Sequence, residues 1–226
     1  MSKNLEFVSV DDEIIVATDI VKSFQTGGER ITVLDHRNIT VQEGTLTILK
    51  GRSGSGKTTL MNILCALDRP DSGSVFIDKK DIINISEKKR EELRRESMGI
   101  IFQSVALIPV MTAYENVDFA LRLSGYKGDH DERIRHVLTS VGLENRMNHF
   151  PLQMSGGEQQ RVAIARAIAH KPKVIFADEP TGALDTQAGL NVMKLFRELI
   201  DEEKITVVMT THDPNLMDMA DQVYEM

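Results

Sequence analysis

The fold of this 226-residue chain is decided by the stretch Gly51-Arg52-Ser53-Gly54-Ser55-Gly56-Lys57-Thr58-Thr59. The stretch matches the pattern G-x-x-x-x-G-K-[S/T], and the sequence around it predicts the strand before it and the helix after it that the pattern requires. Glycines have no Cβ, so the backbone can wrap closely around a phosphate and point successive N–H groups at it. The N-terminus of the following helix adds the positive end of its dipole. The stretch therefore predicts a phosphate-binding loop in an α/β fold.

The side chains of this loop have separate expected roles. Lys57 would place a positive charge on the β- and γ-phosphates of a nucleotide, and the hydroxyl of Thr58 would bind Mg²⁺. The rest of the nucleotide-binding set in the loop is Gly51, Ser53, Gly54, Ser55, Gly56 and Thr59. The alternative is a glycine-rich turn that binds nothing, but such a turn does not require three glycines followed by a lysine and a threonine.

The composition narrows the class of protein. Lys and Arg total 27 and Asp and Glu total 34, so the net charge of -7 gives no general attraction to nucleic acid or anionic lipid. Cys65 is the only cysteine, which excludes an internal disulfide and indicates a buried, inert thiol in a reducing compartment. Residues 1–10 lack the pattern of a signal peptide, and no apolar run approaches the length of a membrane span. Any membrane contact is therefore expected through another chain.

Short β-branched runs alternate with stretches of helical periodicity, which is typical of a parallel sheet with crossover helices. Four of these runs end directly in a polar or glycine-rich element, and they lie at 45–49, 98–102, 174–177 and 205–209. Their endings are the phosphate loop, Gln103, the pair Asp178 and Glu179, and Thr211 with His212. Because ligands of parallel sheets bind outside the carboxyl ends of the strands, we expect these four endings to form one site.

Asp178 and Glu179 place two adjacent carboxylates at the end of a predicted buried strand. Asp178 is expected to hold Mg²⁺ through its water shell, and Glu179 is expected to orient and deprotonate an attacking water. Acidic residues at strand ends can also be solvated or can cap the next helix. The phosphate loop elsewhere in the chain favours the catalytic interpretation.

A second candidate phosphate-binding element is Met154-Ser155-Gly156-Gly157-Glu158, which precedes a helical stretch. Ser155 and Glu158 have the spacing of a capping box, which starts a helix without any ligand. The two glycines between them are unfavourable in a first helical turn unless something must approach the backbone. Exposed N–H groups, a serine hydroxyl and a helix N-terminus together favour a second anion site.

In their order along the chain, these elements resemble the ATP-binding-cassette (ABC) family, and the resemblance covers nearly the whole length. The matching elements are the phosphate loop at 51–59, the Q-loop at Gln103, the signature at 154–158, the Walker B strand at 174–179, the D-loop Ala183-Leu184-Asp185 and the switch histidine His212. Phe24 lies where the family places an aromatic ring on adenine, although a phenylalanine in an apolar neighbourhood can equally belong to the core.

The resemblance implies a fold and a division of the chain. The fold is a P-loop NTPase core with a mostly parallel sheet and flanking helices, an N-terminal antiparallel β subdomain and an inserted α-helical signature subdomain. One ATPase domain would span residues 1–226, with the helical subdomain at roughly 104–160. The segment 104–117 would open that subdomain and face a membrane partner, although its apolar residues could also be core.

The resemblance also implies ATP and Mg²⁺ as cofactors and a mechanism that needs two copies of the chain. Two ATP molecules would lie between head-to-tail copies, with the signature residues Ser155, Gly156, Gly157 and Glu158 of one copy facing the phosphate loop of the other. Asp185 would couple the two sites, and His212 would sense the γ-phosphate beside Glu179. The expected catalytic residues are Lys57, Gln103, Glu179 and His212, and the expected metal site is Thr58, Gln103 and Asp178.

The motifs around the signature and the Walker B strand are most similar to ATPases of the macrolide-export, lipoprotein-release, antimicrobial-peptide-resistance and cell-division group. Met154 and Glu158 stand where many members have Leu and Gln, and both changes conserve size. The implied partners are a second copy of the chain in the ATP-bound state and a membrane permease in a separate chain, with no nucleic acid. The implied location is cytoplasmic, at the inner face of the cell membrane. An ABC ATPase of a cell-division or other non-transport complex is the alternative.

Other classes with a phosphate loop fit less well. A GTPase should show an Asn-Lys-x-Asp motif, which is absent, and a small-molecule kinase does not need the signature. DNA-repair cassettes separate the motifs with long coiled coils, translation-associated cassettes carry two motif sets, and neither feature occurs here. A regulatory module without turnover would not need Glu179 and His212. The charged run 87–96 is expected to form a solvated helix face with paired opposite charges.

Overall fold

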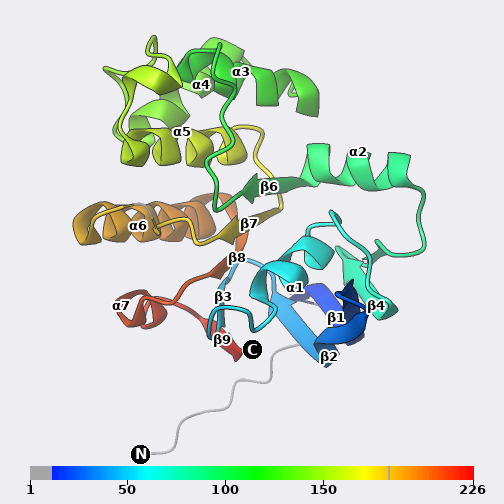
Figure 1. The fold of residues 1–226 in the computed structure, drawn as a ribbon. Helices are drawn as coiled ribbons and strands as arrows, with labels where there is room; N and C mark the ends of the chain where they lie inside the picture. The colour runs from blue at the N-terminus through cyan, green and yellow to red at the C-terminus, as the bar shows by residue number, and fades with distance from the viewer. Residues whose placement is uncertain (1–11, 183) are drawn as a thin grey trace, which may run out of the picture.

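The computed structural model describes residues 12–182 and 184–226, which form two β-sheets and the helices around them (Figure 1). Residues 1–10, which were expected to lack a signal peptide, and the D-loop residue Ala183 lie outside the described residues. Among the residues that are described, no helix has both the length and the apolar character needed to cross a bilayer.

The N-terminal part of the chain forms a four-stranded antiparallel sheet in the order β2-β1-β4-β5. Its strands are β1 (Glu13–Thr26), β2 (Glu29–Gln42), β4 (Ser72–Ile77) and β5 (Lys80–Asp81). β1 and β2 are joined by Gly27 and Gly28, which both have a positive φ and therefore suit a two-residue hairpin turn. This sheet confirms the expected antiparallel subdomain.

A second sheet has five strands in the order β6-β7-β8-β3-β9. Its strands are β3 (Leu46–Lys50), β6 (Met98–Ile101), β7 (Val174–Asp178), β8 (Thr206–Thr210) and β9 (Gln222–Glu225). The neighbouring pairs are parallel, so the carboxyl ends of β3, β6, β7 and β8 lie along one edge. The four apolar runs predicted as strands of a parallel sheet are confirmed.

The helices are α1 (Lys57–Leu64), α2 (Glu87–Ser97), α3 (Ala113–Ser124), α4 (His130–Ser140), α5 (Gly156–Ile168), α6 (Thr186–Glu203) and α7 (Pro214–Met217), with a 3₁₀ turn at Pro151–Gln153. α3, α4 and α5 contact one another and form the upper lobe in Figure 1, whereas α1 lies in the lower part beside the antiparallel sheet. The upper lobe is the inserted helical subdomain of the predicted fold.

The parallel sheet is covered on both faces, which explains why its strands are apolar at nearly every position. Alternate residues of β7 belong to two different hydrophobic clusters: Ile175 and Ala177 to one, Val174 and Phe176 to the other. The first cluster includes side chains of α3, α4, α5 and α6, and the second includes side chains of α1 and the antiparallel sheet. The sheet is therefore the layer on which both parts of the molecule are built.

The charged run at 87–96 forms α2 as expected, but the expectation that its charged face is solvated is wrong in part. Arg90 is only 2% exposed, and its Nη2 donates to the backbone oxygen of Asp68 at 2.6 Å. Arg94 donates to the backbone oxygen of Ala66. Both arginines thus satisfy carbonyls just after the end of α1, which lets the side chain of Arg90 lie buried and that of Arg94 partly buried. Cys65 is buried as predicted, and burial raises its pKa to about 12, so the thiol is inert.

Candidate active site

The phosphate loop between β3 and α1 has a backbone that only glycine accommodates at two positions. Gly54 and Gly56 have φ angles of 82° and 94°, in the left-handed region. A Cβ on Gly56 would lie 2.9 Å from Cδ2 of Leu34 in β2, so this position also lacks room for a side chain. The loop is therefore pressed against the antiparallel sheet in a conformation set by its glycines.

The start of α1 is open to an anion. Gly56 is its N-cap, no side chain caps the helix, and its first turn contains no acidic residue. The first N–H groups of α1 thus keep the partial positive charge that a phosphate would meet. The hydroxyl of Ser55 is buried and has no hydrogen-bond partner among the described residues. An unpaired buried hydroxyl beside uncapped N–H groups fits the expected phosphate.

Lys57 is only 8% exposed, and its ammonium group is held inside the loop. The Nζ atom donates to the backbone oxygens of Gly51 at 2.8 Å and Arg52 at 3.0 Å. These carbonyls orient the ammonium but do not neutralise it, because they carry no net charge. No acidic side chain among the described residues pairs with this ammonium, so a phosphate would supply the counter-ion of the buried charge.

Thr58 and Asp178 meet beside the loop and offer oxygen atoms to a cation. Thr58 Oγ1 donates to Asp178 Oδ2 at 2.9 Å, although the two residues are 120 positions apart. No group of three or more His, Cys, Asp or Glu side chains suited to a metal occurs in the part of the chain that the structure describes. One carboxylate with a hydroxyl fits Mg²⁺, which usually keeps several waters and binds substrate phosphates.

The carboxylate of Glu179 lies between the two polar residues that follow β6 and β8. Gln103 Nε2 donates to Glu179 Oε2 at 3.3 Å, and Nδ1 of His212 lies 3.4 Å from Glu179 Oε1. Glu179 itself has a φ of 48°, in the left-handed region that a residue with a Cβ rarely adopts. Together with Thr58 and Asp178, these contacts bring the endings of β3, β6, β7 and β8 into one place.

The signature segment contains the capping box that its spacing allowed. The amide and the hydroxyl of Ser155 donate to Glu158 Oε2 at 2.8 and 2.9 Å, and the amide of Glu158 donates back to Ser155 Oγ at 3.3 Å. Capping therefore accounts for Ser155 and Glu158 without a ligand. It does not account for Gly156, where a Cβ would meet nothing within 4 Å, so the backbone there is open to approach.

The signature segment and the phosphate loop belong to different parts of the molecule. Figure 1 shows α5 in the upper lobe and α1 in the lower part. No hydrogen bond or ion pair between described residues joins 155–158 to 51–59. One copy of the chain therefore holds two candidate anion sites that do not meet within it.

The structure also shows the contacts and exposure of the two remaining residues predicted to bind ligand, Asp185 and Phe24. Asp185 accepts a hydrogen bond from the amide of Ala188 at 2.9 Å as the N-cap of α6, and it lines a cavity of about 180 Å³ together with Glu179 and His212. Phe24 is 42% exposed on β1, so the alternative that it is a core residue is wrong. Nζ of Lys22 lies 5.4 Å from the centre of its ring, a cation–π distance.

Two residues near these sites have roles that the sequence did not predict. Arg146 Nε donates to Glu158 Oε1 at 2.8 Å, from a loop 12 residues upstream. Thr210 is the last residue of β8, and its hydroxyl donates to Asp178 Oδ1 at 2.6 Å. A hydroxyl in an apolar strand directly before Thr211 and His212 was the only available signal for Thr210. No pattern in the sequence signals Arg146.

The contacts of Glu158 can be tested by measuring how the stability of the protein changes as the pH is lowered. Hydrogen bonds from Arg146 and then from Ser155 lower the pKa of Glu158 from 4.5 to about 2. Because the folded state has the lower pKa, this stabilisation is fully present above pH 4.5 and is lost as the pH falls toward 2. We expect Glu158→Gln to lower the melting temperature by about 2–4 °C at pH 7, and we expect the difference from the wild type to shrink in acid.

Thermal unfolding followed by circular dichroism from pH 7 down to pH 3 measures this difference. The matched control is Glu115→Gln in the capping box of α3, where Thr112 alone holds the carboxylate in the described chain. That variant should show a smaller difference, since it loses no ion pair with arginine. A difference for Glu158→Gln that stays constant across the pH range would contradict the assignment.

Comparison with known proteins places these features in a family. The sequence profile described as ABC transporter matches residues 34–182. The macrolide export ATP-binding/permease protein MacB of Vibrio parahaemolyticus is 41% identical over 217 residues, which is 96% of this chain but 33% of that protein. The lipoprotein-releasing system ATP-binding protein LolD 2 of Rhodopirellula baltica is 43% identical over 220 residues, covering 94% of this chain and 86% of that protein.

A solved structure has the same fold. The dimeric ATP-binding cassette MJ0796, in a post-hydrolysis state bound to ADP and Pi, superimposes with a TM-score of 0.89 at 38% identity and covers 94% of each chain. The present chain thus spans most of LolD 2 and of the MJ0796 cassette, and a third of MacB. The fold, the phosphate loop and these similarities together show that the chain belongs to the ABC transporter family, as an ATP-binding cassette that hydrolyses ATP.

Proposed function

We propose that the chain is the motor subunit of a transporter-like complex, in which binding of Mg-ATP closes two copies and hydrolysis reopens them. The motion would be passed to a membrane permease in a separate chain. The role would lie in export, lipoprotein release, antimicrobial-peptide resistance or mechanotransmission, at the cytoplasmic face of the cell membrane. The observation that carries the proposal is the meeting of Thr58, Gln103, Asp178, Glu179 and His212 at one edge, with the signature segment left in the other lobe.

The proposed hydrolysis uses the carboxylate of Glu179 as general base. Glu179 takes a proton from a water whose oxygen attacks the γ-phosphorus, and the bond to the β–γ bridging oxygen breaks, releasing ADP and phosphate. Gln103 and His212 contact the two oxygens of Glu179 and fix the orientation of the carboxylate. Thr58 and Asp178 would hold Mg²⁺, which supplies charge compensation for the phosphates when bound.

The proposed dimer follows from the separation of the two anion sites. The backbone at Gly156 is open, and Gly156 is the first residue of α5. In a head-to-tail pair, this helix N-terminus would meet the γ-phosphate that the phosphate loop of the other copy holds. Ser155 can join only if its hydroxyl turns away from Glu158, so closure would exchange that hydrogen bond for one to the phosphate.

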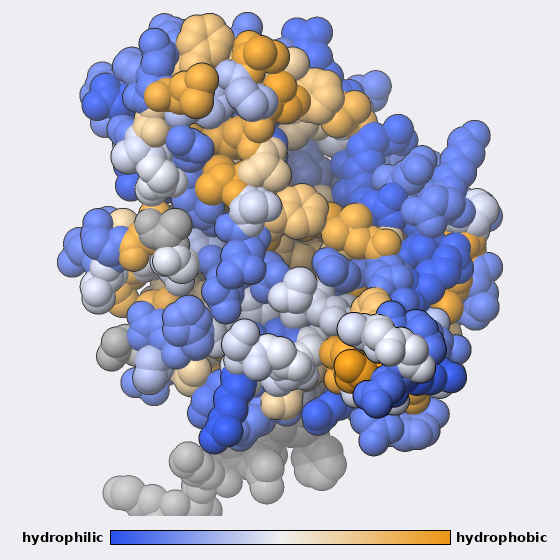
Figure 2. Space-filling view, in the orientation of Figure 1, coloured by the Kyte–Doolittle hydropathy of each residue, from blue (hydrophilic) through white to orange (hydrophobic). Residues whose placement is uncertain are grey.

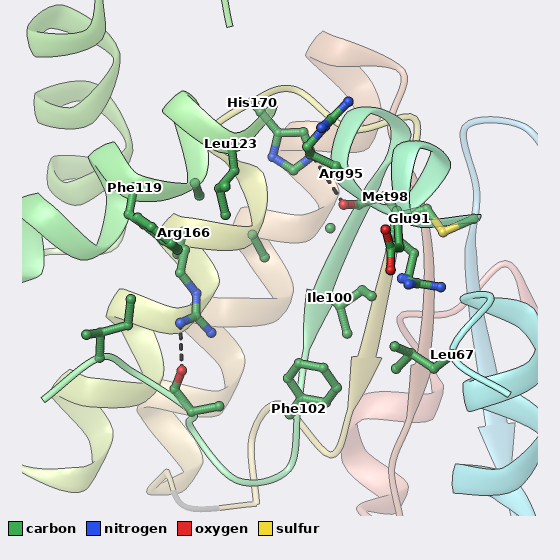
Figure 3. Close-up of a pocket in the computed structure, with 16 residues that line it drawn as sticks. Leu67, Glu91, Arg95, Met98, Ile100, Phe102, Phe119, Leu123, Arg166 and His170 are labelled. Carbon is green, nitrogen blue, oxygen red and sulfur yellow. Dashed lines mark hydrogen bonds between the residues drawn. The ribbon is translucent and has the colours of Figure 1, made fainter. Parts of the chain in front are cut away.

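A groove next to Gln103 supports coupling to a partner. The cavity, of about 530 Å³, lies between α2, β6, α3 and α5, and Figure 3 shows Phe102, Phe119 and Leu123 lining it. Figure 2 shows hydrophobic side chains gathered on this face beside the hydrophilic surface of α2. Phe102 directly precedes Gln103, so anything that shifts the groove wall would also shift a residue in contact with Glu179.

The chemistry of the groove favours one kind of occupant. Its lining is mainly apolar, with Arg94, Arg95 and Arg166 as basic residues and Glu91 as the acidic residue. A short cytoplasmic helix of the permease, with an apolar face and acidic flanks, would match both features. The MacB relative combines an ATP-binding part and a permease part by name, which supports a permease as the partner proposed here.

Affinity purification from native membranes tests this proposal. The wild-type chain should recover a polytopic membrane protein, and Leu123→Glu should reduce that recovery by about tenfold or more, because it places a charge in the apolar lining of the groove. Leu123 is 51% exposed, so the substitution leaves the fold intact. The matched control is Val223→Glu, since Val223 is 47% exposed on β9 at the far edge of the sheet.

The possible outcomes separate the candidate functions. Recovery of soluble proteins alone by the wild-type chain would refute coupling to a permease. Recovery of a division-complex membrane protein with no transport activity would support the non-transport alternative. Equal loss of the partner with Leu123→Glu and Val223→Glu would refute the groove as the docking site.

A further inference from the structure

The buried hydroxyl of Thr210 joins the two acidic residues of the site. Thr210 is fully buried at the end of β8, and the parallel register places it opposite Asp178 of β7. Its Oγ1 donates to Asp178 Oδ1 at 2.6 Å and accepts from the backbone amide of Glu179 at 2.9 Å. A hydroxyl has one donor and two acceptor positions, so both bonds can exist at once. We propose that Thr210 is a positioning residue for hydrolysis, an inference that rests on the proposed roles of Asp178 and Glu179.

For Asp178, the bond to Thr210 fixes the second carboxylate oxygen. Oδ2 already accepts a hydrogen bond from Thr58 on α1, and Oδ1 accepts one from Thr210 on β8, so each carboxylate oxygen has its own donor. With both oxygens held, rotation of the carboxylate about its last bond would break at least one of these hydrogen bonds. The oxygens that would face a cation are therefore oriented before it binds, which is the arrangement that preorganised sites require.

For Glu179, the bond to Thr210 holds an unfavourable backbone. Its φ of 48° is disfavoured for a residue with a Cβ, and such conformations persist only where the surroundings hold them. The amide of Glu179 finds its acceptor in Thr210, and this peptide orientation sends the side chain toward Gln103 and His212. Loss of the acceptor would leave a half-buried amide unpaired and free the peptide to rotate.

The position of Thr210 differs from that of other buried threonines in the same sheet. Thr206, at the other end of β8, accepts from the amide of Gly44, and Thr47 on β3 contacts Gln222 at 3.3 Å. Those hydroxyls satisfy groups remote from the site. Of these three threonines, only Thr210 forms hydrogen bonds with the residue proposed to hold the metal and with the residue proposed to act as base.

The test compares ATP hydrolysis by the purified full chain with that of Thr210→Val and Thr210→Ser. Valine keeps the branched shape but removes the hydroxyl, so we expect kcat to fall about tenfold and the Mg²⁺ concentration for half-maximal activity to rise about fivefold. Affinity for ATP without Mg²⁺, measured in EDTA, should stay within about twofold, because the phosphate loop is untouched. Serine restores the hydroxyl and should return both quantities to within about twofold of the wild type.

The matched control is Thr47→Val, which makes the same chemical change in the same sheet and should leave kcat and the Mg²⁺ dependence unchanged. Wild-type kcat and Mg²⁺ dependence in Thr210→Val would overturn the proposal, as would an equal loss in Thr210→Ser. Should Thr210→Val not fold, Thr210→Cys takes its place, because the thiol is a weak donor of similar size. The variant Asp178→Asn distinguishes failure of the Thr210 proposal from failure of the proposed metal site. Unchanged Mg²⁺ dependence in Asp178→Asn would refute the metal site itself, whatever the result for Thr210.

Discussion

Glu179→Gln is expected to reduce ATP hydrolysis by a factor on the order of 10³ while leaving ATP binding intact. Glutamine keeps the shape of the side chain and can still contact Gln103 and His212, but its amide cannot take a proton from water. ATP then persists, so its γ-phosphate should keep two copies together. Size-exclusion chromatography with Mg-ATP, alongside a turnover assay, should show a stable dimer with almost no product.

The control for this experiment is Glu198→Gln, because Glu198 is exposed on α6 and stands outside the site. That variant should hydrolyse ATP at the wild-type rate and should not accumulate as a dimer. A Glu179→Gln protein that stays monomeric and still turns over ATP would count against both the general base and the shared site.

Lys57→Ala is expected to weaken nucleotide binding by a factor on the order of 10² and to abolish measurable turnover. The substitution removes the only positive side chain held within the described loop backbone, where Nζ bonds to the oxygens of Gly51 and Arg52. It also removes the contacts that tie the two ends of the loop together before nucleotide binds. Titration with a fluorescent ATP analogue and a turnover assay measure the two effects.

The control for this variant is Lys173→Ala. Lys173 precedes β7 at the opposite end of the sheet, and its ion pair with Asp78 is more than half exposed on the lysine side. Removing a surface ion pair has little effect on stability, so hydrolysis should stay within about twofold of the wild type. ATP hydrolysis by Lys57→Ala at the wild-type rate would refute the phosphate-loop assignment.

Much of the fold could be predicted because its signals are local. The apolar runs at β3, β6, β7 and β8 are buried on both faces, so each appears in the sequence as a continuous hydrophobic stretch. Each run is followed at once by its polar ending, and parallel strands bring such endings to one edge. The convergence of Gln103, Glu179 and His212 was predictable for this reason.

Other features depend on contacts that spacing does not reveal. The opposite charges of α2 suggested a solvated face, but Arg90 and Arg94 reach carbonyls of the chain that follows α1. The sequence left open whether Phe24 is a core residue or an exposed one, and its position on β1 leaves the ring exposed. Ser155 was expected to face a phosphate, whereas in the single chain its hydroxyl is engaged with Glu158.

The sequence by itself determined the phosphate loop, the order of the strands along the chain and the capping box at α5, because each depends on residues within a few positions of one another. Only the tertiary structure decided that Thr210 bridges Asp178 and Glu179, and that Arg146 holds Glu158. Those contacts depend on the register between β7 and β8 and on the path of the loop before α5. Hydrogen bonds require atoms within about 3 Å, and only the packing of distant segments brings such atoms together.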